Sequence, residues 1–133
     1  MEKKLNDNEK NLLLKDLCAR LPYKVKCLYF DPEIGTDWVD RIEYVYPFDF
    51  EVGVDQWIFK IDVIKPYLYP LSNMTEEQKE IYCQLQQKVI YNSKGVVNKD
   101  VMNYINWCYE NHLDINDLIP KGLALDATGL NIY

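Results

Sequence analysis

The apolar positions near the start of the chain follow the period of a helix. Within residues 6–21 they recur at the spacing of one helical face, as Leu13, Leu14, Leu17, Cys18 and Leu21, and the charged residues Lys10, Lys15, Asp16 and Arg20 lie mostly opposite. This pattern is typical of an amphipathic helix. Asn6, Asp7 or Asn8 can cap it, and Pro22 ends it because a residue before proline avoids the α region. We predict a helix from about Asn6 to Leu21.

From Lys24 onward the period changes to two, which is typical of strands. The apolar residues in phase are Val25, Cys27 and Tyr29, then Trp38, Ile42, Tyr44 and Tyr46, then Trp57, Phe59, Ile61 and Val63. Asp40 interrupts the second face and marks an edge or a bulge. Short connections favour antiparallel pairing. We therefore predict three strands, or four if residues 48–52 form a short one.

The next segment, KPYLYPL at residues 65–71, contains two prolines, which cannot donate hydrogen bonds to a sheet. We predict an extended crossing segment rather than a central strand. Thr75 and Gln78 fit a capping box, which predicts a second helix that runs to about Asn92 and ends at Ser93–Gly95.

A third helix is predicted from Asn98, its N-cap, to about Asn111. Its apolar stripe consists of Val101, Ile105, Cys108 and His112, and Met102, Trp107 and Tyr109 make its other faces apolar. We therefore expect this helix to be well buried. The remaining chain indicates only a short helical turn within residues 116–121, followed by irregular structure.

This order of elements predicts a single α+β domain over residues 1–133. We expect an N-terminal helix, a three- to four-stranded antiparallel sheet, and two to three C-terminal helices packed on one face of that sheet. The chain has 133 residues, of which 48% are hydrophobic, so it can form a core of its own.

Composition excludes several classes of function. The net charge is −6, which argues against non-specific binding of nucleic acid because that requires basic groups. No apolar run approaches the roughly 20 residues of a membrane span, and the first residues lack the apolar core of a signal peptide. The four cysteines form no CxxC motif. We therefore expect a cytoplasmic protein with four reduced, mostly buried thiols.

The acidic residues are concentrated in one part of the chain. Residues 31–64 carry nine acidic and two basic side chains, whereas residues 1–30 carry four acidic and seven basic ones. These acids are either the solvated side of alternating strands or a surface that docks on a basic partner.

Candidate catalytic chemistry is sparse. His112 is the only histidine, and its place in an apolar stripe near a helix end predicts a packing or capping role. Asp49, Glu51 and Asp55 alternate, so they either hold a divalent cation or line a solvated loop, and the solvated loop is the simpler interpretation. No nucleotide-binding or nucleophile motif occurs. We predict no catalytic, cofactor or metal site.

Aromatic residues are in surplus, with 11 tyrosines, 4 phenylalanines and 3 tryptophans. Four tyrosines, at positions 67, 69, 91 and 133, lie outside the regular apolar spacing. They either pack in the core, which is the simpler interpretation, or are exposed beside acidic residues, where tyrosine is enriched at protein interfaces. The predicted partner-binding residues are therefore Asp40, Glu43, Asp49, Glu51, Tyr67 and Tyr69.

Three stretches resemble small uncharacterised proteins encoded by phages and prophages of gut Bacteroidetes. They are NLLLKDLCARLPY at residues 11–23, IKPYLYPLSNMTEE at 64–77, and HLD at 112–114 with LIPKGLALDA at 118–127. The acidic middle of the chain departs from that pattern. The resemblance implies an intracellular accessory protein of a mobile element, and it transfers no catalytic residue because that family has no assigned activity.

The leading hypothesis is a non-enzymatic protein that binds a host or phage protein, or itself. The alternative is a small carboxylate-dependent hydrolase or nucleotide-modifying enzyme that uses acids of the same region. A DNA mimic would require acids spaced like phosphates over a longer surface.

Overall fold

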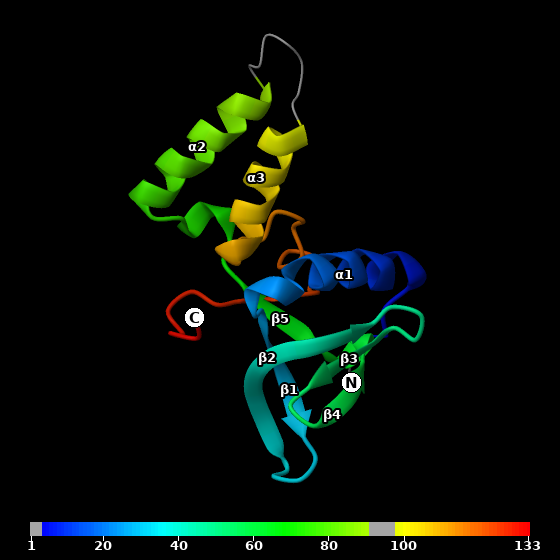
Figure 1. Cartoon of the computed structure of the whole chain (residues 1–133). Helices are drawn as coiled ribbons and strands as arrows, with labels where there is room; N and C mark the ends of the chain where they lie inside the picture. Colours follow the sequence, from blue (N-terminus) through cyan, green and yellow to red (C-terminus); the bar gives the residue numbers. More distant parts are fainter. Residues whose placement is uncertain (1–3, 91–97) are drawn as a thin grey trace.

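The computed structural model describes residues 4–90 and 98–133 and shows an α+β fold (Figure 1). Its helices are α1 (Asp7–Arg20), α2 (Glu76–Ile90) and α3 (Asn98–Glu110). Its strands are β1 (Lys26–Asp31), β2 (Thr36–Tyr46), β3 (Glu51–Val54), β4 (Trp57–Lys60), β5 (Lys65–Leu68) and β6 (Leu125–Asp126). The predicted end of the second helix at Ser93–Gly95, and Tyr91, lie outside the described residues.

Helix α1 begins and ends where the sequence predicts. Asn6 is the N-cap, and it exchanges hydrogen bonds with Glu9: the Glu9 N–H donates to Asn6 Oδ1 at 2.8 Å and the Asn6 N–H donates to Glu9 Oε1 at 3.1 Å. This reciprocal capping box satisfies two amide donors that the first helical turn leaves free. A single 3₁₀ turn containing Pro22 follows α1.

A buried ion pair joins α1 to the segment after α3. Arg20 is fully buried and donates to both carboxylate oxygens of Asp16, at 2.5 and 3.2 Å, and to the Leu113 carbonyl at 2.7 Å. Asn116 also donates to Asp16, at 2.9 Å. The prediction that Asp16 and Arg20 lie on the solvent side of the helix is wrong, because these bonds compensate their burial.

The sheet has six strands in the order β4-β3-β2-β1-β5-β6, and only β5 and β6 are parallel. The predicted count of three to four strands is therefore too low, and the predicted purely antiparallel sheet is in fact mixed. The buried residues Val25, Cys27 and Tyr29 confirm the inward face of the first strand.

The apolar face predicted for β2 is wrong beyond Ile42. The pairing of β2 with β3 shifts between Ile42 and Tyr44, which is a bulge, and the extra residue reverses the side on which later residues lie. Ile42 is buried, whereas Tyr44 and Tyr46 are exposed. Trp38 is also exposed, although it pairs with the buried Tyr29, and it lies near the start of β2 at the turn of the β1–β2 hairpin.

The long third strand predicted over residues 56–64 divides in two. Strand β4 ends at Lys60, a 3₁₀ turn covers Ile61–Val63, and β5 then begins at Lys65. Val63 is 38% exposed rather than part of an inward face. The chain turns here because β4 is the edge of the sheet and β5 lies on the other side of β1.

Strand β5 corrects the prediction that the prolines keep residues 65–71 out of the sheet. Pro66 pairs with Cys27 in a ladder of only two residue pairs, so its missing N–H interrupts little. One step further along, the Lys26 N–H donates to the Tyr133 hydroxyl at 2.8 Å, and that hydroxyl donates to the Tyr67 carbonyl at 2.7 Å. The phenol therefore bridges β1 and β5 where direct pairing stops.

The helical turn predicted within residues 116–121 is a series of turns, and β6 follows it where irregular chain was expected. The Asp114 carboxylate organises these turns by accepting the N–H groups of Leu118 and Ile119 at 2.8 and 2.9 Å. Leu125 then pairs with Tyr67 of β5.

Helices α2 and α3 pack on each other and extend away from the sheet, rather than covering one of its faces as predicted (Figure 1). The predicted capping box at Thr75 and Gln78 is confirmed by two hydrogen bonds. Within the described part of α3 only Cys108 is fully buried, so the prediction of a well-buried helix is wrong.

The main core lies between α1 and the curved sheet. Its fully buried side chains include Leu13, Leu17, Cys27, Val52 and Ile61. All four cysteines are free, as predicted, but Cys18 and Cys83 are exposed. Among residues 4–90 and 98–133, no helix combines the length and hydropathy needed to cross a bilayer.

Candidate protein-binding surface

Two cross-strand rows form an outward apolar face on the β2–β3–β4 part of the sheet. Register places Tyr44 beside Gly53 and Ile58, and Tyr46 beside Glu51 and Lys60. Paired residues of antiparallel strands lie on the same face of a sheet. We call this set the outer face: Tyr44, Tyr46, Glu51, Gly53, Ile58 and Lys60.

The apolar members of the outer face are open to solvent. Tyr44 is 59% exposed and Ile58 is 60% exposed, and the rings of Tyr44 and Tyr46 lie 6.4 Å apart between centroids. Phe48, in the turn that joins β2 to β3, is 99% exposed. Apolar side chains that cluster on an otherwise polar surface mark sites of association.

Gly53 allows the Tyr44 side chain to pack closely over the neighbouring strand. A Cβ built on this glycine would stand 3.2 Å from Cδ2 and 3.3 Å from Cβ of Tyr44, so the aromatic side chain occupies the space of a side chain at position 53. The glycine is buried beneath it. This packing fixes the position of the tyrosine ring while leaving most of it exposed.

Acidic side chains border the outer face. Residues 42–60 contain four acidic residues and one basic residue. Lys60 lies 3.4 Å from Glu51, so it forms an ion pair with one of these acids. An apolar patch and a negative border are therefore contiguous on this part of the sheet.

The structure brings together three of the six predicted partner-binding residues. Glu51 lies on the outer face, Asp49 is exposed in the β2–β3 turn beside Phe48, and Glu43 in the bulge lines a shallow hollow with Tyr44. Their common location follows from the hairpin, which places both of its strands and their turn on one surface.

The other three predicted residues lie elsewhere. Asp40 pairs with the buried Cys27 on the opposite face, where it adds to the effect of burial in raising the pKa of that thiol to about 12. Tyr67 is buried, and Tyr69 is half-buried against the ring of Tyr133 at 5.9 Å. Sequence reasoning missed Tyr44, Phe48 and Ile58, although a glycine within a strand was a usable signal for close packing at position 53.

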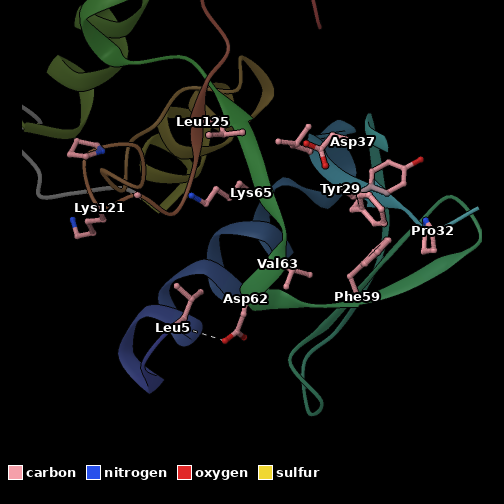
Figure 2. A pocket seen from close by; sticks show the side chains of 14 residues that line it. Leu5, Tyr29, Pro32, Asp37, Phe59, Asp62, Val63, Lys65, Lys121 and Leu125 are labelled. Atoms are coloured by element: carbon pink, nitrogen blue, oxygen red, sulfur yellow. Dashed lines mark hydrogen bonds between the residues drawn. The ribbon is translucent and has the colours of Figure 1, made fainter. Parts of the chain in front are cut away.

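The structure also contains a cavity of about 990 Å³ beside β1 and β5 (Figure 2). Its carboxylates Asp37 and Asp62 lie at different ends, and Asp62 already accepts the Leu5 N–H at 3.2 Å. They do not form a converging pair for acid–base catalysis. No group of three metal-ligating side chains occurs among the residues that the structure describes.

His112 has a structural position at the end of α3. Its N–H donates to the Tyr109 carbonyl and the next N–H donates to the Cys108 carbonyl, which is a Schellman motif with His112 at φ 57°. Its ring stacks on Tyr133 at 3.6 Å between centroids. The predicted packing role is confirmed by this contact.

We expect His112 to make stability depend on pH. Burial, with smaller effects from the Arg20 and Lys26 charges, lowers its pKa from 6.5 to about 4. Between these values the unfolded chain binds a proton that the folded chain does not, so stability falls as pH decreases from 6.5 to 4. If the His112 ring were fully shielded from solvent, this loss of stability would be about 3 kcal/mol. Because the ring is partly exposed, we expect a loss of about 1–2 kcal/mol.

Urea unfolding of the wild type and of His112→Asn at several pH values measures this effect. Asparagine tolerates positive φ, so the variant keeps the helix end and removes the titrating ring. We expect the difference in stability between the two proteins to change over pH 4–6.5 and to stay constant above it. A constant difference over the whole range would contradict the assignment.

Comparison with protein-family models, curated proteins and solved structures found no match to this chain.

Proposed function

We propose that this protein acts without catalysis by binding another protein, and that the outer face is its binding surface. The observation that carries the proposal is the contiguity of exposed Tyr44, Tyr46 and Ile58 with an acidic border. Aromatic side chains surrounded by a polar rim are the usual energetic centre of an interface.

The partner should present an apolar centre with a basic rim. The border of the outer face carries the excess negative charge of residues 42–60, since Glu51 and Lys60 within the face offset each other. Opposite charge on a partner speeds encounter and fixes orientation, whereas two copies of this face would repel each other. Self-association through this face is therefore disfavoured relative to a basic partner.

We further propose that the protein is a cytoplasmic accessory protein of a phage or prophage. Support for this comes from the three stretches that resemble such proteins, at residues 11–23, at 64–77, and at 112–114 with 118–127. The partner would then be a host or phage protein present in the same compartment.

Affinity capture from a bacterial lysate, followed by identification of the captured proteins, tests the binding surface. We expect the double variant Tyr44→Ser/Ile58→Ser to lose at least about tenfold of the captured partner, since it removes two anchors. Met102→Ser is the matched control, because Met102 is 53% exposed on α3 and lies outside the outer face. Equal loss in the control would contradict the proposal.

The acidic border has its own test. Charge reversal at Glu43, Asp49 and Glu51 to lysine should weaken capture most strongly at low salt, where screening is weakest. The control reverses Glu76, Glu77 and Glu80 of α2, all exposed, and changes the net charge equally. Capture of an acidic protein, or equal weakening by both triple variants, would show that the acidic border is not the recognition element.

A further inference from the structure

The cavity of about 990 Å³ is floored by one face of β1 and β5 (Figure 2). Register pairs Leu28 with Lys65, and Phe30 with Asp37, so these four side chains project from the same side of the sheet. Leu125 of β6 joins them because it pairs with Tyr67, two residues after Lys65. The turn at residues 120–122 forms a wall.

Much of this floor is apolar yet exposed to solvent. Phe30 is 54% exposed and Val63 is 38% exposed, and Leu28 and Leu125 are half-buried. Ligand sites in proteins are concave, about 300–1,000 Å³ in volume, and lined mainly by apolar side chains with a few charged groups. The cavity is at the upper end of that range.

The two lysines of the cavity lie on one side of it and, in the part of the chain that the structure describes, lack ion-pair partners, whereas Asp62 has one. Lys65 lies beside Leu125, and Lys121 lies beyond them on the same side of the view (Figure 2). Among the described residues Lys65 has no ion-pair partner, and the Lys121 ammonium contacts only the Asp117 carbonyl, at 3.5 Å. Asp62, in contrast, forms an ion pair with Lys10 at 3.9 Å and accepts a hydrogen bond from the Leu5 N–H. One side of the cavity is therefore cationic in a chain whose net charge is −6.

We propose that this cavity binds a small amphipathic carboxylate. The apolar part of the ligand would cover Leu28 and Phe30, and the ligand's carboxylate would lie between the ammonium groups of Lys65 and Lys121. Ligand binding would cover exposed apolar surface and place a carboxylate beside two lysines that have no ion-pair partner among the described residues. This site is separate from the outer face and does not depend on the proposed function.

Titration with octanoate, followed by amide NMR spectra of the wild type, tests the site. We expect shifts at residues 28, 30, 65 and 125 and weaker or no binding of octylammonium, which has the same chain and the opposite charge. Lys65→Gln/Lys121→Gln should weaken octanoate binding about tenfold or more. Lys88→Gln/Lys99→Gln makes the same change in net charge on exposed helix positions and should leave binding unchanged.

Three results would overturn the proposal. The first is equal binding of octanoate and octylammonium, and the second is shifts confined to the outer face. The third is an absence of octanoate binding under conditions where anionic vesicles or an acidic peptide bind at these residues, because it would assign the cavity to a macromolecule. The wild-type shift map decides the location even if a lysine variant fails to fold.

Discussion

Replacing Arg20 by alanine is expected to lower the free energy of unfolding by about 3–5 kcal/mol. The guanidinium is fully buried, holds the Asp16 carboxylate through two hydrogen bonds, and lies 4.8 Å from the centroid of the Tyr109 ring. Alanine would leave the Asp16 charge buried with Asn116 as its remaining donor, and would leave the Leu113 carbonyl without the Arg20 bond. An uncompensated buried charge is among the largest penalties that one substitution causes.

Chemical denaturation of three variants separates the charge effect from a general loss of packing. The double variant Arg20→Met/Asp16→Leu removes both charges and keeps apolar volume, so it should be more stable than Arg20→Ala. Arg41→Ala changes the only other arginine, which is exposed on β2, and should stay within about 0.5 kcal/mol of the wild type. A double variant as unstable as Arg20→Ala would show that shape rather than charge pairing dominates this site.

Replacing Tyr133 by alanine is expected to destabilise the protein by about 2–4 kcal/mol. Its ring stacks on His112 at 3.6 Å and contacts Tyr69, and its hydroxyl bridges the backbones of Lys26 and Tyr67. The Lys26 ammonium also donates to the Ile132 carbonyl at 2.6 Å. Alanine removes both the packing between α3 and the sheet and the bridge between β1 and β5.

Tyr133→Phe isolates the bridging hydroxyl. The ring stays on His112, so we expect a loss of only about 1–2 kcal/mol, which reflects the two backbone groups left without their partner. Tyr46→Phe is the control, because that exposed tyrosine lies on the outer face, and its stability should not change. If Tyr133→Phe were as stable as the wild type, solvent would satisfy the two strands equally well.

Local features of the fold could be predicted because the residues that determine them are adjacent in sequence. The capping boxes of Asn6 with Glu9 and of Thr75 with Gln78 span four residues each, and both helices start there. The alternation in β1 gave its buried face for the same reason. The position of Pro66 in the sheet could not be predicted, since it depends on how short the pairing with β1 is and on the distant Tyr133.

The sequence pointed to the acidic residues of the candidate surface but not to its aromatic residues. The concentration of acidic residues in the segment 31–64 predicted a surface on the hairpin that carries Glu43, Asp49 and Glu51. Its aromatic centre was missed because a single bulged residue turns Tyr44 and Tyr46 outward, and a one-residue shift is invisible to a period-two pattern. Tyr67 shows the opposite case. Its position does not fit the regular apolar spacing, yet it is buried, because β5 pairs with strands that are distant in sequence.

The contact between Tyr69 and Leu113 has a consequence for how the architecture can vary. The Tyr69 N–H donates to the His112 carbonyl at 2.8 Å, and the Asp114 N–H donates to the Tyr69 carbonyl at 2.9 Å. The chain therefore leaves the sheet and returns to it at the same point, with α2 and α3 forming an excursion between β5 and β6. Because the cost of closing a loop depends only weakly on its length, this excursion can lengthen or shorten beyond its base, provided that Tyr109 and His112 keep their contacts with Arg20 and Tyr133.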